Sequence, residues 1–333
     1  MGSEREPRVV VVTGASAGVG RATARAFGAR GDRVALVARG EDGLRAGVAE
    51  VEAAGGRGLA VPADVAEPAA MEEAAALVER ELGPIDVWVN DAMATVFAPF
   101  MEITPEEYRR STETTYLGCV WGTRAALARM VPRDRGVVVQ VGSALAFRGI
   151  PLQAPYCAAK HAIEGFSESV RVELMHDGSA VRVCMVHMPA LNTPQFEIGR
   201  TKLPRHPQPV PPIYQPEVAA EAIVWMSEHR RRQLYVGAPT LKTVIGNRLA
   251  PWLGDLYLAR TGYEAQQTEE PVDPDRPDNL FAPVPGDHGA HGRFGEGARR
   301  RSTVTWASRH RRALGALGAL AAAGGGALAL ARR

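Results

Sequence analysis

The sequence predicts an α/β fold: a doubly wound, parallel, Rossmann-like sheet in a single domain with a C-terminal extension. Short β-branched runs alternate with helical periodicity up to about residue 240. The runs are continuously apolar, which is typical of parallel strands covered on both faces. A glycine-rich turn, TGASAGVG, joins the first run to the first helix. With 333 residues, 46% of them hydrophobic, the chain can bury a core of this size.

The first βαβ unit consists of a strand at 8–13, a helix at 21–30 and a strand at 33–38. The further predicted elements are a helix at 41–55, a strand and turn at 58–65, a helix at 68–82, a strand at 85–90, a helix at 114–130, a strand at 136–142, a helix that carries Tyr156, a strand at 181–188, an irregular Pro-rich stretch from Pro189 to Pro216, a helix at 216–229 and a strand at 234–237. The run at 241–260 is apolar enough to pack against this domain or to lie at an interface.

The glycine-rich turn predicts a dinucleotide site. Glycines let the backbone turn tightly and approach a pyrophosphate, whose charge is met by the helix N-terminus. The position directly between a strand and a helix makes this pattern specific, because three glycines elsewhere are an ordinary loop. The residues expected to contact the cofactor here are Gly14, Ser16, Gly18, Val19 and Gly20.

The end of the second strand favours NADP over NAD. An NAD site would place an acidic residue there to bind the ribose 2′-hydroxyl, but the strand ends in Val-Ala-Arg-Gly at 37–40. Arg39 can pair with a 2′-phosphate, and a solvated arginine is the alternative interpretation. Asp64, followed by Val65 after the third strand, could accept a hydrogen bond from the adenine amino group; a turn-forming aspartate is equally compatible.

Tyr156 and Lys160 are spaced four residues apart on a predicted helix, and Ser143 ends the apolar strand before it. Residues at this spacing lie roughly 5–6 Å apart on one helix face. A phenol needs a shift of about three pKa units, roughly 4 kcal/mol, to titrate near neutral pH, and a neighbouring cation can supply much of it. Alone, Tyr156 and Lys160 could belong to an ordinary solvated helix face. Together with the glycine-rich turn, the pair predicts proton transfer to a carbonyl oxygen.

The ordered set of TGASAGVG, Asp64, Asn90, Ser143 and Tyr156-x-x-x-Lys160 resembles the short-chain dehydrogenase/reductase family over roughly residues 8–240. The resemblance implies one Rossmann-like domain with a seven-stranded parallel sheet, usually in homodimers or homotetramers. It implies that Tyr156 is the general acid/base, that Lys160 lowers its pKa and binds the nicotinamide ribose, and that Ser143 binds the substrate oxygen. It also places Asn90, Pro189 and Thr193 at the cofactor, with Thr193 at the carboxamide.

Four features depart from the family pattern. NNAG after the fourth strand reads Asn90-Asp91-Ala92-Met93, which puts a bulky side chain where glycine is usual. Thr115 stands where an asparagine normally links the lysine through water to solvent, and its hydroxyl is expected to hold that water. Ala190 replaces the glycine after Pro189, and Thr193 comes one residue early.

Charge and composition limit the classes of binding partner and the cell compartment that we expect. A formal charge of +2 gives no case for nucleic acid. Three cysteines lie in apolar runs without metal spacing, so we expect buried thiols in a reducing compartment and no metal. The segment MGSEREPRVV has no apolar signal region, and a cytoplasmic location is the expectation.

The predicted domains are a Rossmann-like NAD(P)-binding catalytic domain at 1–262, a flexible Pro/Gly-rich linker at 263–308, and an Ala/Gly/Leu-rich tail at 309–333. Residues 313–331 form 19 uncharged positions between basic flanks, just adequate for a membrane span. Glycines at 324–326 disfavour a helix, so membrane attachment and an unstructured tail both stay open.

The leading hypothesis is an NADPH-dependent reductase, or the reverse dehydrogenase, acting on a carbonyl or alcohol. An apolar substrate fits the apolar residues that are expected near the pocket, which are Leu145, Phe147, Leu152, Met188 and Phe196. Ordinary core residues would show the same pattern. In one variant of this hypothesis the enzyme is held at a membrane and acts on a lipid or another apolar ketone. The alternative is a catalytically weak dinucleotide-binding scaffold or sensor, which Met93, Thr115 and Ala190 motivate.

Overall fold

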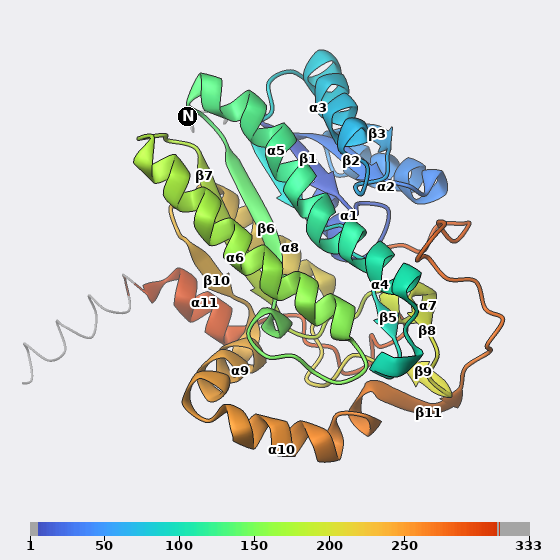
Figure 1. Ribbon diagram of the computed structural model, residues 1–333. Helices are drawn as coiled ribbons and strands as arrows, with labels where there is room; N and C mark the ends of the chain where they lie inside the picture. The colour runs from blue at the N-terminus through green and yellow to red at the C-terminus, as the bar shows by residue number, and fades with distance from the viewer. Residues whose placement is uncertain (1–5, 312, 314–333) are drawn as a thin grey trace, which may run out of the picture.

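A computed structural model describes residues 6–311 and residue 313, and its centre is a seven-stranded parallel sheet (Figure 1). The strand order is β10-β7-β6-β4-β1-β2-β3, with every pairing parallel. The strands are β1 Val9–Thr13, β2 Arg33–Ala38, β3 Arg57–Pro62, β4 Val87–Asn90, β6 Val137–Ser143, β7 Arg182–Met188 and β10 Gln233–Tyr235. The order reverses direction on the two sides of β1, so the predicted doubly wound fold is confirmed.

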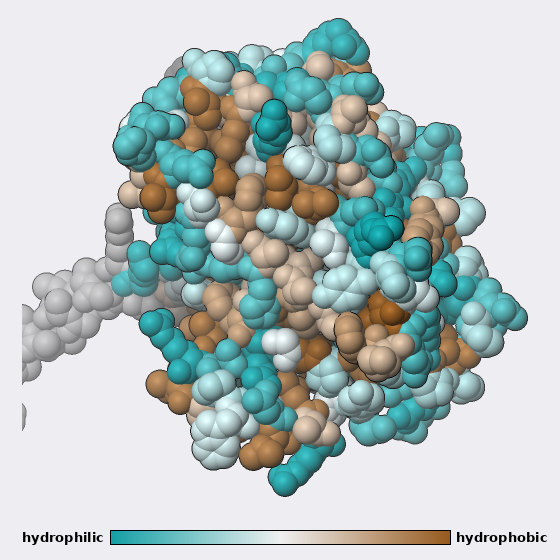
Figure 2. All heavy atoms as spheres, viewed as in Figure 1, coloured by the Kyte–Doolittle hydropathy of each residue, from teal (hydrophilic) through white to brown (hydrophobic). Residues whose placement is uncertain are grey.

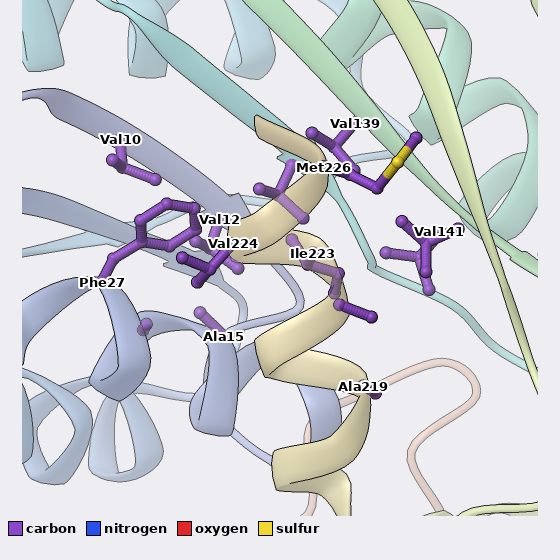
Figure 3. Close-up of a cluster of buried hydrophobic side chains, with 14 of the residues drawn as sticks. Val10, Val12, Ala15, Phe27, Val139, Val141, Ala219, Ile223, Val224 and Met226 are labelled. Atoms are coloured by element: carbon purple, nitrogen blue, oxygen red, sulfur yellow. The ribbon is translucent and has the colours of Figure 1, made fainter. Parts of the chain in front are cut away.

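Helices cover both faces of the sheet. One face carries α1 Gly18–Gly28, α2 Glu41–Ala53 and α8 Pro216–Glu228. The other carries α3 Pro68–Leu82, α5 Gly118–Met130 and α6 Ala154–His176, and a π-helical turn, η2 Glu113–Leu117, connects α4 Pro105–Thr112 to α5. Figure 3 shows the first of these cores, where Phe27 of α1 and Ile223 of α8 pack over the valines of β1 and β6.

The two cores explain the apolar strand runs. Along β1, Val10 and Val12 belong to one core, whereas Val9 and Val11 belong to the other. All four are essentially inaccessible to solvent. A strand with both faces buried shows no polar alternation, which is why these runs are continuously apolar.

Smaller elements cluster at the carboxyl edge of the sheet. Two short strand pairs form there: β5 Val96–Phe97 with β8 Arg200–Thr201, and β9 Arg205–Pro207 with β11 Gln267–Pro271. The remaining elements are η1 Phe100–Glu102, η3 Val131–Arg133, η4 Ala144–Ala146, α7 Gln195–Ile198, α9 Gly237–Leu249, α10 Pro251–Thr261, η5 Glu264–Gln266 and α11 Thr303–Arg309.

Residues 263–308 differ from the predicted flexible linker, because they pack against the catalytic domain. β11 pairs antiparallel with β9, and Leu280 is fully buried in a cluster with Ala94 and Val96. Composition alone suggested disorder, since the segment is poor in apolar residues. Its backbone carbonyls nevertheless accept hydrogen bonds from side-chain and backbone donors at the edge of the sheet. These bonds satisfy the polar backbone of an irregular segment that has no large core of its own.

The predicted tail at 309–333 lies largely outside the described residues. Only residues 309–311 and 313 of it are described. Across the described part of the chain, no helix combines the length and the apolar character needed to cross a bilayer.

The packed extension predicts that Leu280→Ala destabilises the protein. Truncating a buried leucine typically costs about 2–5 kcal/mol, and urea unfolding should show a loss in the free energy of unfolding within that range. Phe281→Ala is the matched control, because Phe281 is 51% exposed and should cost less than about 1 kcal/mol. Equal and negligible effects of the two changes would show that this segment does not pack.

Candidate active site

The three predicted catalytic side chains meet in one cavity. Ser143 ends β6, while Tyr156 and Lys160 lie in the first two turns of α6. The cavity has a volume of about 780 Å³ and all three residues line it. The Lys160 ammonium lies 5.5 Å from the centre of the Tyr156 ring and donates to the carbonyl oxygen of Val141 at 2.6 Å. The i, i+4 spacing thus brings the amine beside the phenol, as the sequence predicts.

Burial dominates the protonation of these groups. It raises the pKa of Tyr156 above the usual value of a phenol, and a hydrogen bond with Ser143 opposes that rise. Burial also lowers the pKa of Lys160, against the attraction of Asp91. The lowering of the tyrosine pKa by Lys160 that the sequence led us to expect stays a prediction. The phenol is therefore held in its protonated form, which can donate a proton.

Asp91 is a site residue that the sequence reasoning did not assign. It lines the cavity, and burial raises its carboxyl pKa to about 7, while Lys160 and the backbone N–H of Gly20 lower it. Its own N–H donates to the hydroxyl of Thr13 at 3.1 Å, which fixes the turn after β4. The signal in the sequence was the acidic residue in NDAM, where the family pattern has asparagine.

Thr115 has a different position from the one expected. Its hydroxyl donates to the carbonyl of Ala94 and accepts from the N–H of Ala94, both at 2.9 Å, so it fixes the turn after β4. It does not line the cavity, whereas Thr114, one position earlier, does. The Thr114 hydroxyl is buried and has no hydrogen-bond partner among the described residues. The π-helical turn sets which of the two threonines faces the cavity, and no local pattern in the sequence predicts that turn.

Asn90 also differs from its expected role at the cofactor. Its amide nitrogen donates to Gln140 at 2.9 Å and to Thr123 at 3.0 Å, and its amide oxygen accepts from the Trp88 indole at 2.8 Å. These bonds connect β4 to β6 and α5 inside the core. Asn90 therefore positions the strand that carries Asp91 and does not line the cavity.

The glycine turn forms the wall of the cavity at the other end. Gly14 has φ +70, and a Cβ there would lie 2.8 Å from the Cα of Ala92. A Cβ on Gly20 would lie 2.4 Å from the carbonyl oxygen of Gly14, so this glycine supports the turn from behind. The expected cofactor residues that line the cavity are Gly14, Ser16, Gly18, Val19, Arg39, Asp64, Val65, Tyr156, Lys160, Pro189 and Thr193.

Two arginines lie at the far end of this wall. Arg39 donates to the carbonyl oxygens of Leu280 and Phe281, at 3.3 and 3.1 Å, and to that of Asn279. Arg110 forms an ion pair with Asp64 and also donates to Leu280. Burial, followed by repulsion from Arg110, lowers the pKa of Arg39. Arg39 lines the cavity at this end, and Arg110 holds Asp64, another lining residue.

Residues 279–292, which we name the strap, run along the same wall. The carbonyl of Gly289 accepts from the N–H of Gly18 at 3.0 Å, at the start of α1. Asp287 pairs with Arg21 at 3.2 Å, and the N–H of Gly286 donates to Asp42 at 3.1 Å. Asn279, Pro283, Val284, Gly286 and His288 line the cavity. The strap therefore forms one side of the predicted cofactor site. It lies outside residues 8–240, so the family motifs do not predict it.

Comparison with known proteins identifies the family. Residues 8–202 match the family model for short chain dehydrogenases. The chain is 33% identical over 276 residues to an uncharacterized oxidoreductase, YxnA, of Bacillus subtilis, covering 82% of this chain and 78% of that protein. It is 33% identical over 178 residues to the 3-oxoacyl-[acyl-carrier-protein] reductase FabG of Escherichia coli, covering 54% and 72%.

Solved structures agree. A short-chain dehydrogenase from Streptomyces avermitilis superposes with a TM-score of 0.63 at 28% identity, over 78% of this chain and 97% of that one. A metagenomic short-chain oxidoreductase in complex with NADP gives 0.59 at 27%, over 70% and 98%. The chain belongs to the short-chain dehydrogenase/reductase family. It is an NAD(P)-dependent oxidoreductase.

The similarity to YxnA extends beyond the family core. A match covering 82% of 333 residues cannot end at residue 202 and must include α9 and α10. Part of the C-terminal extension is therefore shared with that relative.

The raised pKa of Asp91 predicts a pH-dependent stability. Because the folded carboxyl holds its proton more tightly than the unfolded one, the stability due to this group is highest at low pH and falls as pH rises towards and through about 7. Between pH 5 and pH 8 we expect wild type to lose about 1 kcal/mol relative to Asp91→Asn, since Asp91 is only partly buried and solvent reduces the full effect. Urea unfolding at several pH values measures this. Asp177→Asn, at an exposed position, is the control and should follow wild type.

Proposed function

We propose that this chain is an NADP-dependent carbonyl reductase, or the reverse alcohol dehydrogenase, with Tyr156 as general acid/base. The observation that carries the proposal is that Ser143, Tyr156 and Lys160 line the same cavity as the glycine turn. The proton donors lie at one end of the cavity, and a wall suited to phosphates lies at the other. These two parts fit the two halves of a hydride-transfer reaction.

The residues present fit a dinucleotide. Gly14 and Gly20 lie where any Cβ would collide with backbone, so only glycine allows the tight turn that leads into the N-terminus of α1, where a phosphate would be bound. In the proposed complex Gly18 and Val19 bind the pyrophosphate, and the N–H of Gly18 exchanges the Gly289 carbonyl for a phosphate oxygen. Arg39 binds the adenosine end and Thr193 the nicotinamide end. A bound nicotinamide would supply or accept the hydride.

The proton chemistry belongs to the protein. The hydroxyls of Ser143 and Tyr156 bind the carbonyl oxygen, and Tyr156 donates its proton to that oxygen as negative charge develops on it. In the oxidative direction the tyrosinate accepts the proton back. Lys160, held by Val141, stabilises the tyrosinate, and Asp91 balances the charge of Lys160. The buried, unpartnered Thr114 hydroxyl is placed to bind a water in this group of residues.

Arg39 supports the choice of NADP over NAD. No carboxylate stands at 37–40, and Arg110 adds a second guanidinium nearby. The carbonyls of the strap that now bind Arg39 are neutral acceptors, and a phosphate dianion is a stronger partner for a guanidinium. One similar structure was solved with NADP.

The cavity supports an apolar substrate. Leu145, Met188 and Phe196 line it, as expected. Phe147 instead packs on His187, with ring centres 4.8 Å apart, and Leu152 is buried beside Phe97. Ile150, Leu191, Leu253 and Leu258 add apolar surface that the sequence reasoning did not include.

The scaffold or sensor hypothesis is not favoured, because the complete catalytic set faces an open cavity and the named relatives are oxidoreductases. A cytoplasmic location and assembly as a homodimer or homotetramer stay proposals that rest on the sequence and on the family.

Tyr156→Phe tests the proton donor. Removing the hydroxyl should lower kcat for NADPH-dependent ketone reduction by about 10²–10⁴-fold, the usual contribution of general acid catalysis. NADPH binding, followed by fluorescence, should persist. Tyr108→Phe, on α4 and outside the cavity, is the control and should keep full activity. An unchanged kcat in Tyr156→Phe would contradict this mechanism.

Arg39→Asp tests the cofactor. A charge-assisted hydrogen bond contributes about 1.5–3 kcal/mol, so the preference for NADPH over NADH in kcat/KM should fall at least about tenfold. Arg57→Asp makes the same charge change at an exposed position on β3 and should leave the preference unaltered. A preference that is retained in Arg39→Asp would contradict the assignment to NADP.

A further inference from the structure

The helices α9 and α10 leave an unusual amount of apolar surface exposed. No residue of α10 is buried, although most of its residues are apolar. We name the α10 face as the exposed set Ile245, Leu249, Trp252, Leu253, Leu256 and Tyr257, whose exposures run from 49% to 79%. Figure 1 shows α10 as the outermost element below the sheet, and Figure 2 shows hydrophobic residues at the same lower edge.

The four residues of the α10 face that lie on α10 itself form a stripe along that helix. Trp252 and Leu256 are four residues apart, as are Leu253 and Tyr257, so they lie on adjacent turns of α10. A surface helix normally buries such a stripe against its own core. Nothing within residues 6–311 covers it. Contiguous exposed apolar surface of this kind marks an interaction site.

The charges around the α10 face suit an anionic partner. Residues 237–263 contain three basic side chains, Lys242, Arg248 and Arg260, and one acidic side chain, Asp255. Asp255 is already paired with Arg148. Arg248 and Arg260 are exposed beside the apolar stripe. Apolar residues with Trp and Tyr, flanked by basic groups, are the composition of helices that lie in a lipid headgroup region.

The position of the α10 face adds two links to a bilayer. Leu253 and Tyr257 belong to the α10 face and also line the catalytic cavity, so the face adjoins that cavity. The last described helix, α11, is bound to the start of α9, because the N–H of Gly237 donates to Thr305 at 3.1 Å. The uncharged sequence 313–331 therefore follows directly from an element attached to α9.

We propose that the α10 face binds peripherally to an anionic lipid bilayer, with Trp252 and Leu256 among the headgroups and upper acyl chains. The cavity then opens towards the membrane, from which an apolar substrate can enter. The binding step does not depend on the proposed reaction, so failure of the Tyr156 prediction would leave it intact.

Flotation of the full-length protein with vesicles tests the proposal. Vesicles of equal parts phosphatidylglycerol and phosphatidylcholine should bind wild type, and pure phosphatidylcholine should bind it less. Trp252→Ser/Leu256→Ser should bind the anionic vesicles at least about tenfold more weakly, because each exposed side chain loses its apolar burial. Met101→Ser/Met175→Ser is the matched control, since both methionines are more than 70% exposed on other elements. Residues 309–333 are present in every variant.

Three outcomes would overturn the proposal. The first is that wild type binds no vesicle. The second is that the Trp252/Leu256 variant binds as wild type does, which would assign attachment to the sequence after α11. The third is that sedimentation without lipid shows the variant dissociating an oligomer, which would make the face an interface between copies. Arg248→Glu/Arg260→Glu separates charge from apolar burial, and should remove the preference for anionic vesicles.

Discussion

The close contact between the carboxyl ends of β1 and β4 is the constraint on which the site depends. The hydroxyl of Thr13 accepts hydrogen bonds from the N–H groups of Asp91 and Ala92, at 3.1 and 3.2 Å. The next residue, Gly14, has no room for a Cβ because Ala92 is in contact with it. This contact places the glycine turn beside the Asp91 turn, so the centre of the sheet brings the proposed phosphate-binding turn next to the carboxylate that attracts Lys160.

Burial then determines the chemistry of that opening. The same low-dielectric surroundings raise the pKa of Tyr156, raise that of Asp91 and lower that of Lys160. Each shift favours the neutral form, and the opposite charges of Asp91 and Lys160 partly restore the ionised pair. The neutral phenol of Tyr156 lies near an amine and a carboxyl whose pKa values are shifted by burial. This arrangement is suited to donating a proton and accepting it back.

The C-terminal extension completes the cavity instead of trailing from it. The strap supplies one wall along the glycine turn, and α9 and α10 supply another near the catalytic residues. The strap contacts Arg39 through the carbonyl of Phe281 and the start of α1 through the carbonyl of Gly289, which accepts from Gly18.

The sequence by itself determined the parallel sheet, the glycine turn and the Ser143, Tyr156 and Lys160 set, because each depends on local spacing: buried strands are continuously apolar, and an i, i+4 pair shares a helix face. The tertiary structure decided the rest. A π-helical turn exchanges Thr115 for Thr114 at the cavity, Asn90 turns into the core, and residues 263–308 pack as a wall. These outcomes depend on contacts between residues distant in the chain, such as Arg39 with Phe281, and no local pattern encodes which donor will meet which acceptor.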